Sequence, residues 1–229
     1  MKKYQTLLLI MVFMLAGRIF PAEPVVFDFK SQSELSRWKL RRTNLIIPAS
    51  KFFISHADGA RDNKVLVVSC KSSSGVMMLS PKELDLHKTP VMKWRWRIIR
   101  PVVFKGDKEP DDQAAGIYIA DGTTLRQFSV SYRWETLNTP GTEKLVRYSG
   151  GAMTVNAVCL RNRQTPPGVW VEEERDVLAD FQKAFKRGIQ SYYAIGISGN
   201  SQYSKSNTRV EIDYIEFHPR SAKIQEVNK

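Results

Sequence analysis

Acidic side chains that could perform acid–base chemistry occur in two places in this chain of 229 residues. Asp111 and Asp112 directly precede an expected strand, and Glu172 and Glu174 lie at the end of another, just before an expected helix. Two carboxyl groups act as acid and base in sugar hydrolysis when they lie about 5–5.5 Å or about 6.5–9.5 Å apart. Sequence spacing does not establish such a distance. These four residues are therefore candidate catalytic residues of a glycan hydrolase or lyase.

A structural role for Glu172 and Glu174 is the alternative. Successive side chains of a strand point to opposite faces, so these two share one face. Opposite charges on neighbouring strands commonly form pairs across a sheet. The available partners are Arg95, Arg97 and Arg175. The sequence favours ion pairing of this kind over catalysis.

Metal chemistry has one candidate location. A calcium ion could bind at Asp111 and Asp112, because hard cations prefer clustered carboxylates and carbonyls. The surrounding loop lacks the regular carboxylate spacing of calcium loops, so no cofactor beyond such a structural calcium is expected. His56, His87 and His218 are isolated, without the spacing of zinc ligands. The chain also lacks a nucleophile elbow, a phosphate loop and a dinucleotide motif.

Arginine and aromatic residues alternate in the middle of the chain. Over residues 91–99, Trp94 and Trp96 share one face of an expected strand and Arg95 and Arg97 share the other. Alternating aromatic residues usually fill the core of a sandwich, which leaves the arginine face for a ligand. Arginine side chains suit carboxylates or phosphates, and binding pockets combine aromatic rings with a few polar groups. The candidate ligand-binding residues are Arg95, Arg97, Tyr118, Tyr132 and Trp134.

Short segments rich in β-branched and aromatic residues predict many strands with turns between them. Residues 31–38 are interpreted as a polar connection, and Asp121-Gly122 signals a hairpin. A βαβ fold would need a helix between most strands, and the chain lacks these. We predict an all-β protein, an antiparallel β-sandwich of the jelly-roll type. The expected strands are residues 25–29, 51–55, 64–70, 76–79, 91–99, 114–120, 126–134, 145–148, 152–160, 169–174, 192–198 and 209–217.

One short segment, residues 176–187, follows a helical pattern instead. Val177, Phe181 and Phe185 recur at a spacing of four, which predicts an amphipathic helix. Asp176 precedes it and is expected to cap its first turn. In the last expected strand the apolar phase shifts, which predicts a bulge near Tyr214.

These segments resemble a bacterial exported family catalogued as domain of unknown function 3047, from about residue 25 to residue 217. The resemblance implies no established activity. It implies a fold similar to the galactose-binding-like jelly rolls of carbohydrate-binding modules, and fold alone does not fix function. Residues 199–204 depart from the family pattern, because they lack the carboxylates expected there. The resemblance rests on Trp94-Arg95-Trp96-Arg97, Asp111-Asp112, Tyr132-x-Trp134, the block 170–185, Ile195-Gly196-Ile197 and Asp213-Tyr214-Ile215.

The N-terminus has the features of a secretory signal peptide, predicted over residues 1–22. A basic start is followed by an apolar run over residues 7–16, which is too short to span a membrane. Cleavage fits either after Ala22 or near Ala16 and Gly17, and an uncleaved anchor is the alternative. A single β-sandwich domain is expected over residues 23–219, followed by a polar tail over residues 220–229. The expected location is the periplasm or the outside of the cell.

The charge and the cysteines fit this compartment. Lys and Arg total 35 against 23 Asp and Glu, giving a net charge of +12. Without Lys2, Lys3 and Arg18 the balance is 32 minus 23, or +9, which favours acidic partners. Export argues against nucleic acid and favours an anionic polysaccharide, lipid headgroups or the anionic envelope surface, and a solvated basic surface without a specific partner is the alternative. Cys70 and Cys159 could form a disulfide there or remain two buried thiols.

Three functions are consistent with these observations. The first is an exported β-sandwich that binds a carbohydrate, an anionic envelope or extracellular glycan. The second is a glycan hydrolase or lyase on the same scaffold. The third is a structural envelope protein that binds another protein, which an exposed apolar patch would favour.

Overall fold

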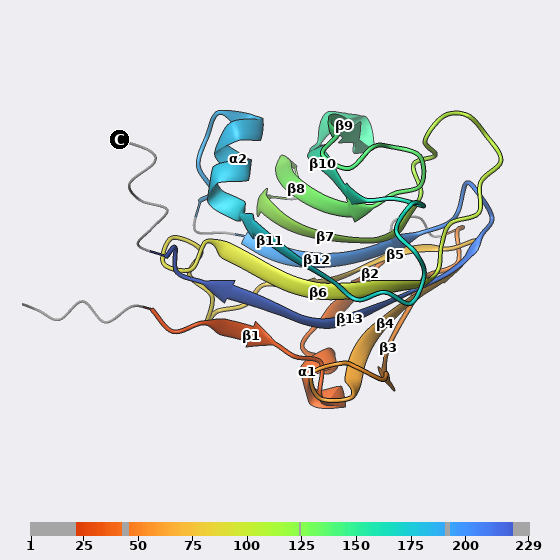
Figure 1. Ribbon diagram of the computed structural model, residues 1–229. Coiled ribbons are helices and arrows are strands. Elements are labelled where there is room, and N and C mark those ends of the chain that lie inside the picture. The colour runs from red at the N-terminus through yellow and green to blue at the C-terminus, as the bar shows by residue number, and fades with distance from the viewer. Residues whose placement is uncertain (1–21, 43–45, 124, 191–192, 222–229) are drawn as a thin grey trace, which may run out of the picture.

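The computed structural model describes residues 22–42, 46–123, 125–190 and 193–221. Two β-sheets pack face to face, and the helix Val177–Phe185 stands at one end of the sandwich (Figure 1). The predicted all-β sandwich is therefore confirmed. Residues 1–21 of the expected signal peptide and residues 222–229 of the expected polar tail lie outside the described residues. Within the part of the chain described, no helix has the length and apolarity needed to cross a membrane.

The first sheet has six strands. Its central strand, β13 (Asn207–His218), pairs with β6 on one side and β4 on the other, both antiparallel. β1 (Val25–Phe27) also pairs with β13. The remaining strands, in sheet order around β13, are β11 (Val171–Asp176), β6 (Val91–Arg100), β4 (Lys64–Lys71) and β3 (Lys51–His56).

The second sheet has seven strands. Its order differs from the chain order, because β12 (Tyr193–Asn200) lies between two strands from earlier in the sequence. One neighbouring pair, β8 and β10, is parallel, which corrects the expectation of an antiparallel sandwich at this place. The chain reaches β10 only after forming the edge strand β9, so β10 runs in the direction of β8. The other strands are β2 (Lys39–Arg41), β5 (Ser74–Leu79), β7 (Gln113–Gly122), β8 (Gln127–Trp134), β10 (Met153–Arg161) and β9 (Glu143–Tyr148).

The predicted amphipathic helix is α2 (Val177–Phe185). Asp176 caps it as predicted, since its carboxylate accepts a hydrogen bond of 3.0 Å from the backbone N–H of Ala179. Lys186 ends the helix in a left-handed conformation. The sequence analysis missed the short helix α1 (Gln32–Ser36) and the strand β2, both near the interpreted polar connection, and the 3₁₀ turn η1 (Ser149–Gly151).

Aromatic rings from both sheets fill the core, as strand alternation predicts for Trp94 and Trp96. The ring of Trp94 packs against that of Tyr132 with 5.3 Å between their centroids, and Trp96 packs against Trp134 at 5.4 Å. Tyr132 is 0% exposed and Trp134 is 1% exposed. The sequence analysis placed these two residues on a ligand-binding face, whereas the structure places them between the sheets. Neither ring is accessible to a ligand.

Two irregularities change which face a side chain occupies. The register of β13 against β6 shifts between Ile212 and Tyr214, which confirms the predicted bulge. In β7, Gly116 is paired with Ser198, yet Gln113 is paired with Asn200, so β7 contains one extra residue. Ala114 and Ala115 are both in the core as a result, and Gln113 moves to the outer face of the sheet.

The two cysteines are free thiols. Cys70 lies on β4 in the first sheet and Cys159 on β10 in the second, and both side chains are buried. The structure thus favours the second of the two expected states. Burial raises the pKa of Cys159 to about 12, and the nearby carboxylates of Glu135 and Glu109 add to this effect.

Candidate functional site

A groove of about 410 Å³ lies on the outer face of the seven-stranded sheet. All seven strands of that sheet contribute lining residues, so the groove runs across the strands. Its walls combine charged, amide and hydroxyl groups with tyrosine rings and with the apolar side chains of Val76, Met78, Met153 and Val155. Side chains that determine its chemistry are Arg41, Asp111, Gln113, Tyr118, Arg133 and Tyr148.

Strand alternation makes the groove floor polar. In β8, Ser129, Ser131 and Arg133 line the groove, while Val130 and Tyr132 between them point into the core. Ser129 and Ser131 follow one another on this face of the strand, and their short side chains leave space above the sheet. The sequence of β8 therefore provides an apolar inner face and a polar outer face, and the groove forms over the outer one.

Tyr118 of β7 gives the groove a flat aromatic surface. It is paired in register with Gly196 of β12, and a Cβ atom at Gly196 would collide with the Cζ, Cε1 and Cε2 atoms of the Tyr118 ring. The ring therefore lies across the neighbouring strand, directly over the glycine. Burial raises the pKa of Tyr118, against the opposing effect of the Arg41 charge, so the hydroxyl remains protonated at neutral pH.

A partly buried charged cluster forms part of the groove. Tyr148 donates a hydrogen bond of 2.8 Å from its hydroxyl to Oδ1 of Asp111. Arg133, which is 7% exposed, donates to the same oxygen at 3.4 Å and to the Tyr148 hydroxyl at 3.3 Å. Burial raises the pKa of Tyr148, with Arg133 acting in the opposite direction. Tyr148 is therefore a hydrogen-bond donor at neutral pH, and Asp111 is already bound by two protein groups.

Amide and hydroxyl groups extend the cluster along the floor. The side-chain amide of Asn200 donates to the backbone carbonyl of Asp111 at 2.6 Å, and that of Gln113 donates to Oγ of Ser198 at 3.4 Å. Ser198 in turn donates to the carbonyl of Gly116 at 3.3 Å. These side chains are largely buried, so their positions are fixed by bonds within the protein.

Both carboxylates expected as calcium ligands, those of Asp111 and Asp112, accept hydrogen bonds from groups of the protein. Asp112 is 1% exposed, and its two carboxylate oxygens accept hydrogen bonds from the backbone N–H groups of Tyr203 and Ser204 at 3.2 and 2.6 Å. Asp112 therefore fixes the loop before β13. Nowhere in the described ranges do three or more His, Cys, Asp or Glu side chains form a group able to hold a metal ion.

Arg95 and Arg97 lie away from the groove, on the outer face of the six-stranded sheet. Arg95 pairs with Asp213 at 3.0 Å and Arg97 pairs with Glu211 at 2.8 Å. Trp170 covers both, with its ring centre 4.7 Å from the Arg95 guanidinium carbon and 4.4 Å from that of Arg97. The two arginines predicted to bind the ligand are thus neutralised and covered by groups of the protein itself.

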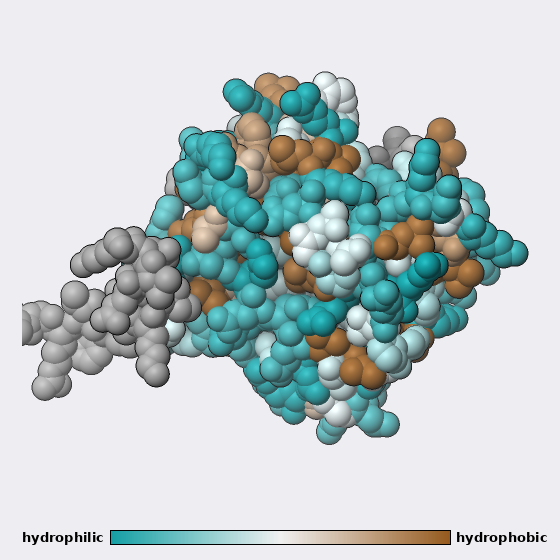
Figure 2. Space-filling model, turned by 45° about the horizontal axis from the view of Figure 1, so that its top comes forward, coloured by the Kyte–Doolittle hydropathy of each residue, from teal (hydrophilic) through white to brown (hydrophobic). Residues whose placement is uncertain are grey.

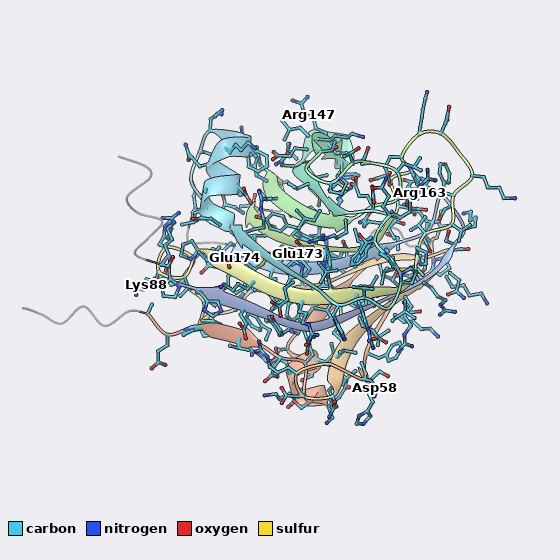
Figure 3. The ribbon with its side chains drawn as sticks, viewed as in Figure 1. Asp58, Lys88, Arg147, Arg163, Glu173 and Glu174 are labelled. Carbon is cyan, nitrogen blue, oxygen red and sulfur yellow. The ribbon has the colours of Figure 1, made fainter. Side chains whose placement is uncertain are left out.

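Glu172 and Glu174 also belong to the six-stranded sheet, on β11 (Figure 3 labels Glu174). Glu174 pairs with Lys93 at 2.8 Å, and Glu172 lies 4.0 Å from Arg95. Ion pairing, the alternative from the sequence, is what the structure shows, with a lysine as one partner. The two pairs of candidate catalytic carboxylates are not brought together, because Asp111 lines the groove of the other sheet.

Of the candidate ligand-binding residues, only Tyr118 lines the groove. The sequence analysis did not select Arg41, Gln113 or Tyr148 for the site. The alternation of residues 127–134 could have identified Arg133 as a site residue, because it places this arginine on the same strand face as two serines. No local signal marked Gln113, because the bulge in β7 determines its face.

The fold and the site define a β-sandwich protein with an open groove, lined by both polar and apolar side chains, on one sheet. Residues 36–216 match the family described as Protein of unknown function (DUF3047), and the chain belongs to this family. A comparison with curated proteins gives no match.

Several solved β-sandwich structures are similar to the chain. A family 11 carbohydrate-binding module of Clostridium thermocellum has a TM-score of 0.42 and 10% identity, covering 84% of this chain and 92% of that one. Winged bean acidic lectin has a TM-score of 0.39 and 13% identity, covering 87% and 99%. Endoglucanase 3 of Trichoderma harzianum has a TM-score of 0.39 and 8% identity, covering 80% and 95%.

Proposed function

We propose that this protein binds a carbohydrate, an anionic glycan, in the groove of the seven-stranded sheet. The observation that carries this proposal is the Tyr118 ring lying flat over Gly196, in a groove rich in hydroxyl, amide and guanidinium groups. A sugar ring offers apolar C–H faces and polar edges. An aromatic surface with a few fixed polar groups around it is complementary to both.

The groove favours an anionic chain. All seven strands line it, which suits an extended ligand. Arg41, Arg42 and Arg133 line it against one carboxylate among the described lining residues, that of Asp111, so the charge is three minus one, or +2. Without Lys2, Lys3 and Arg18 of the expected signal peptide the chain carries 32 minus 23, or +9, which raises the local concentration of anionic ligands.

Binding is better supported than hydrolysis or elimination. Hydrolysis of a glycoside generally needs two carboxyl groups flanking the bond, and Asp111 is already held by Arg133 and Tyr148. A lyase needs a base that removes a proton from the sugar. Burial raises the pKa of both Tyr118 and Tyr148, which keeps them protonated.

The proposed location is the periplasm or the cell exterior, following the signal sequence expected over residues 1–22. We propose an envelope or extracellular glycan as the partner, and we do not propose binding to nucleic acid. The alternative of an envelope protein that docks another protein would be favoured by a large apolar surface. On the face shown in Figure 2, hydrophobic residues form separate small patches among hydrophilic ones, so this face offers no large apolar surface for such docking.

The test is glycan binding by the protein and by Tyr118→Ala, measured by titration calorimetry with neutral and anionic oligosaccharides and with product analysis of every mixture. We expect Tyr118→Ala to weaken binding by about ten-fold or more, because it removes the aromatic contact surface. The control is Phe53→Ala, which removes an aromatic ring that is 38% exposed on β3 of the other sheet. It should bind as the parent does.

Three results would contradict the proposal. Binding of no glycan by the folded protein would contradict it outright. Equal binding by the parent and Tyr118→Ala would remove the groove as the site. Release of shortened or unsaturated products would show that the protein is an enzyme.

A further inference from the structure

We infer that Arg41 is the residue that selects acidic sugar units over neutral ones, by contacting a carboxylate or sulfate of the ring that stacks on Tyr118. This inference rests on the proposed function. It goes further by assigning charge recognition to one end of the groove.

The register places two arginines at opposite ends of one row across the sheet. Arg41 is paired with Val76, Val76 with Ser198, Ser198 with Gly116, and Gly116 with Arg133. Neighbouring strands lie about 4.8 Å apart, so the four steps separate the two arginine backbones by about 19 Å along the sheet. The short residues between them form the low floor of the groove.

The two arginines differ in what they bind. Arg133 is buried and donates to Ser131, Asp111 and Tyr148. Arg41 is exposed, and its side chain forms no hydrogen bond or ion pair with any of the described residues. The Asp111 carboxylate lies at the Arg133 end. Because the screening length at physiological salt is about 8 Å, that carboxylate barely offsets the charge of Arg41.

Tyr118 connects the stacking surface to Arg41. Its ring extends from β7 over Gly196 of β12, toward β5 and β2, because the outer ring atoms occupy the space above that glycine. The positive charge of Arg41 opposes the rise in the pKa of Tyr118, so its field reaches this ring. A sugar stacked on Tyr118 therefore has its edge beside Arg41, where an anionic substituent gains a charge-assisted hydrogen bond.

The experiment compares the parent with Arg41→Gln on matched pairs of probes. The first pair is an oligogalacturonate and its carboxyl-reduced, neutral counterpart. The second pair is a sulfated galactan oligosaccharide and its desulfated form. The control is Arg163→Gln, which removes the same charge from an exposed loop residue between β10 and β11, outside the groove (Figure 3).

We expect the parent to prefer the acidic member of at least one pair. Arg41→Gln should lose about ten- to a hundred-fold in affinity for that member, the effect of one hydrogen bond to a charged group. Its affinity for the neutral member should be unchanged, and Arg163→Gln should match the parent. The pair that responds distinguishes carboxylate from sulfate.

Two outcomes overturn the inference while leaving carbohydrate binding in the groove intact. One is equal binding of both members of every pair by the parent. The other is an acidic preference that persists in Arg41→Gln. Failure of the folded parent to bind any of the four probes or any other glycan would instead contradict the proposed function, and with it this inference.

Discussion

The ring of Tyr118 lies over Gly196, its paired neighbour on β12, and fills the space that a side chain at that position would need. The two residues act as one unit, because the position of the ring depends on the missing Cβ atom. This relationship creates the flat surface at the centre of the groove. It also makes a conservative change at Gly196 a test of the site.

Gly196→Ala should displace the Tyr118 ring and weaken glycan binding by about ten-fold, because the added methyl group takes the place of the ring and removes the stacking surface. Forcing atoms into an occupied space costs about 1–3 kcal/mol of folding stability. Titration calorimetry and urea unfolding measure the two effects. Gly188→Ala is the control, since a Cβ there meets no atom within 4 Å. Unchanged binding by Gly196→Ala would show that ring position does not matter.

Asp176→Ala should lower the free energy of unfolding by about 0.5–2 kcal/mol, because it removes the cap of α2. The same carboxylate pairs with the exposed Arg220, a contact of small value at the surface. Asp176→Asn keeps a capping oxygen and should retain most of the stability. Urea unfolding of both variants measures this. Unchanged stability of Asp176→Ala together with lost glycan binding would make Asp176 a site residue instead.

Glu135→Gln should stabilise the protein progressively, relative to the parent, as the pH rises above about 4.5. Burial is the main reason why the pKa of Glu135 is raised above its ordinary value of 4.5, and the nearby Glu109 adds to it. The folded state thus holds this proton more tightly than the unfolded state. At a pH between the unfolded-state and the folded-state pKa of Glu135, unfolding releases this proton. The contribution of Glu135 to stability therefore falls as the pH rises from the unfolded-state pKa through the folded-state pKa.

Urea unfolding of the parent and Glu135→Gln at several pH values measures this difference. Asp107→Asn, which alters an exposed carboxylate, is the control and should follow the parent at every pH. A difference between Glu135→Gln and the parent that stays constant with pH would mean that Arg133, 3.9 Å from the Glu135 carboxylate, compensates for its burial.

Local patterns in the sequence correctly predicted those elements whose buried face depends on residues only a few positions apart. Alternation in residues 91–99 placed Trp94 and Trp96 in the core, and the spacing of Val177, Phe181 and Phe185 identified α2. The same alternation assigned Arg95 and Arg97 to the opposite face correctly. It did not reveal that Asp213, Glu211 and Trp170, from other segments, satisfy both guanidinium groups.

Tyr132 shows why the candidate site was only partly predicted. It alternates with Arg133, so a strand pattern assigns the two residues to opposite faces. The pattern does not state which face meets the other sheet. Tyr132 is directed inward against Trp94, and its hydroxyl donates to Asp180 of α2 at 2.7 Å. The groove therefore formed on the face of Arg133 rather than on that of Tyr132.

The sequence by itself determined the all-β class, the two faces of each strand and the capped helix, because these depend on neighbours a few positions apart. The tertiary structure decided which of those faces became the groove. Arg41 and Arg133 share one row only because β5, β12 and β7 lie between their strands, and Gln113 faces outward only because β7 bulges. Strand order and register depend on packing between distant segments, and that packing brings the parts of the site together.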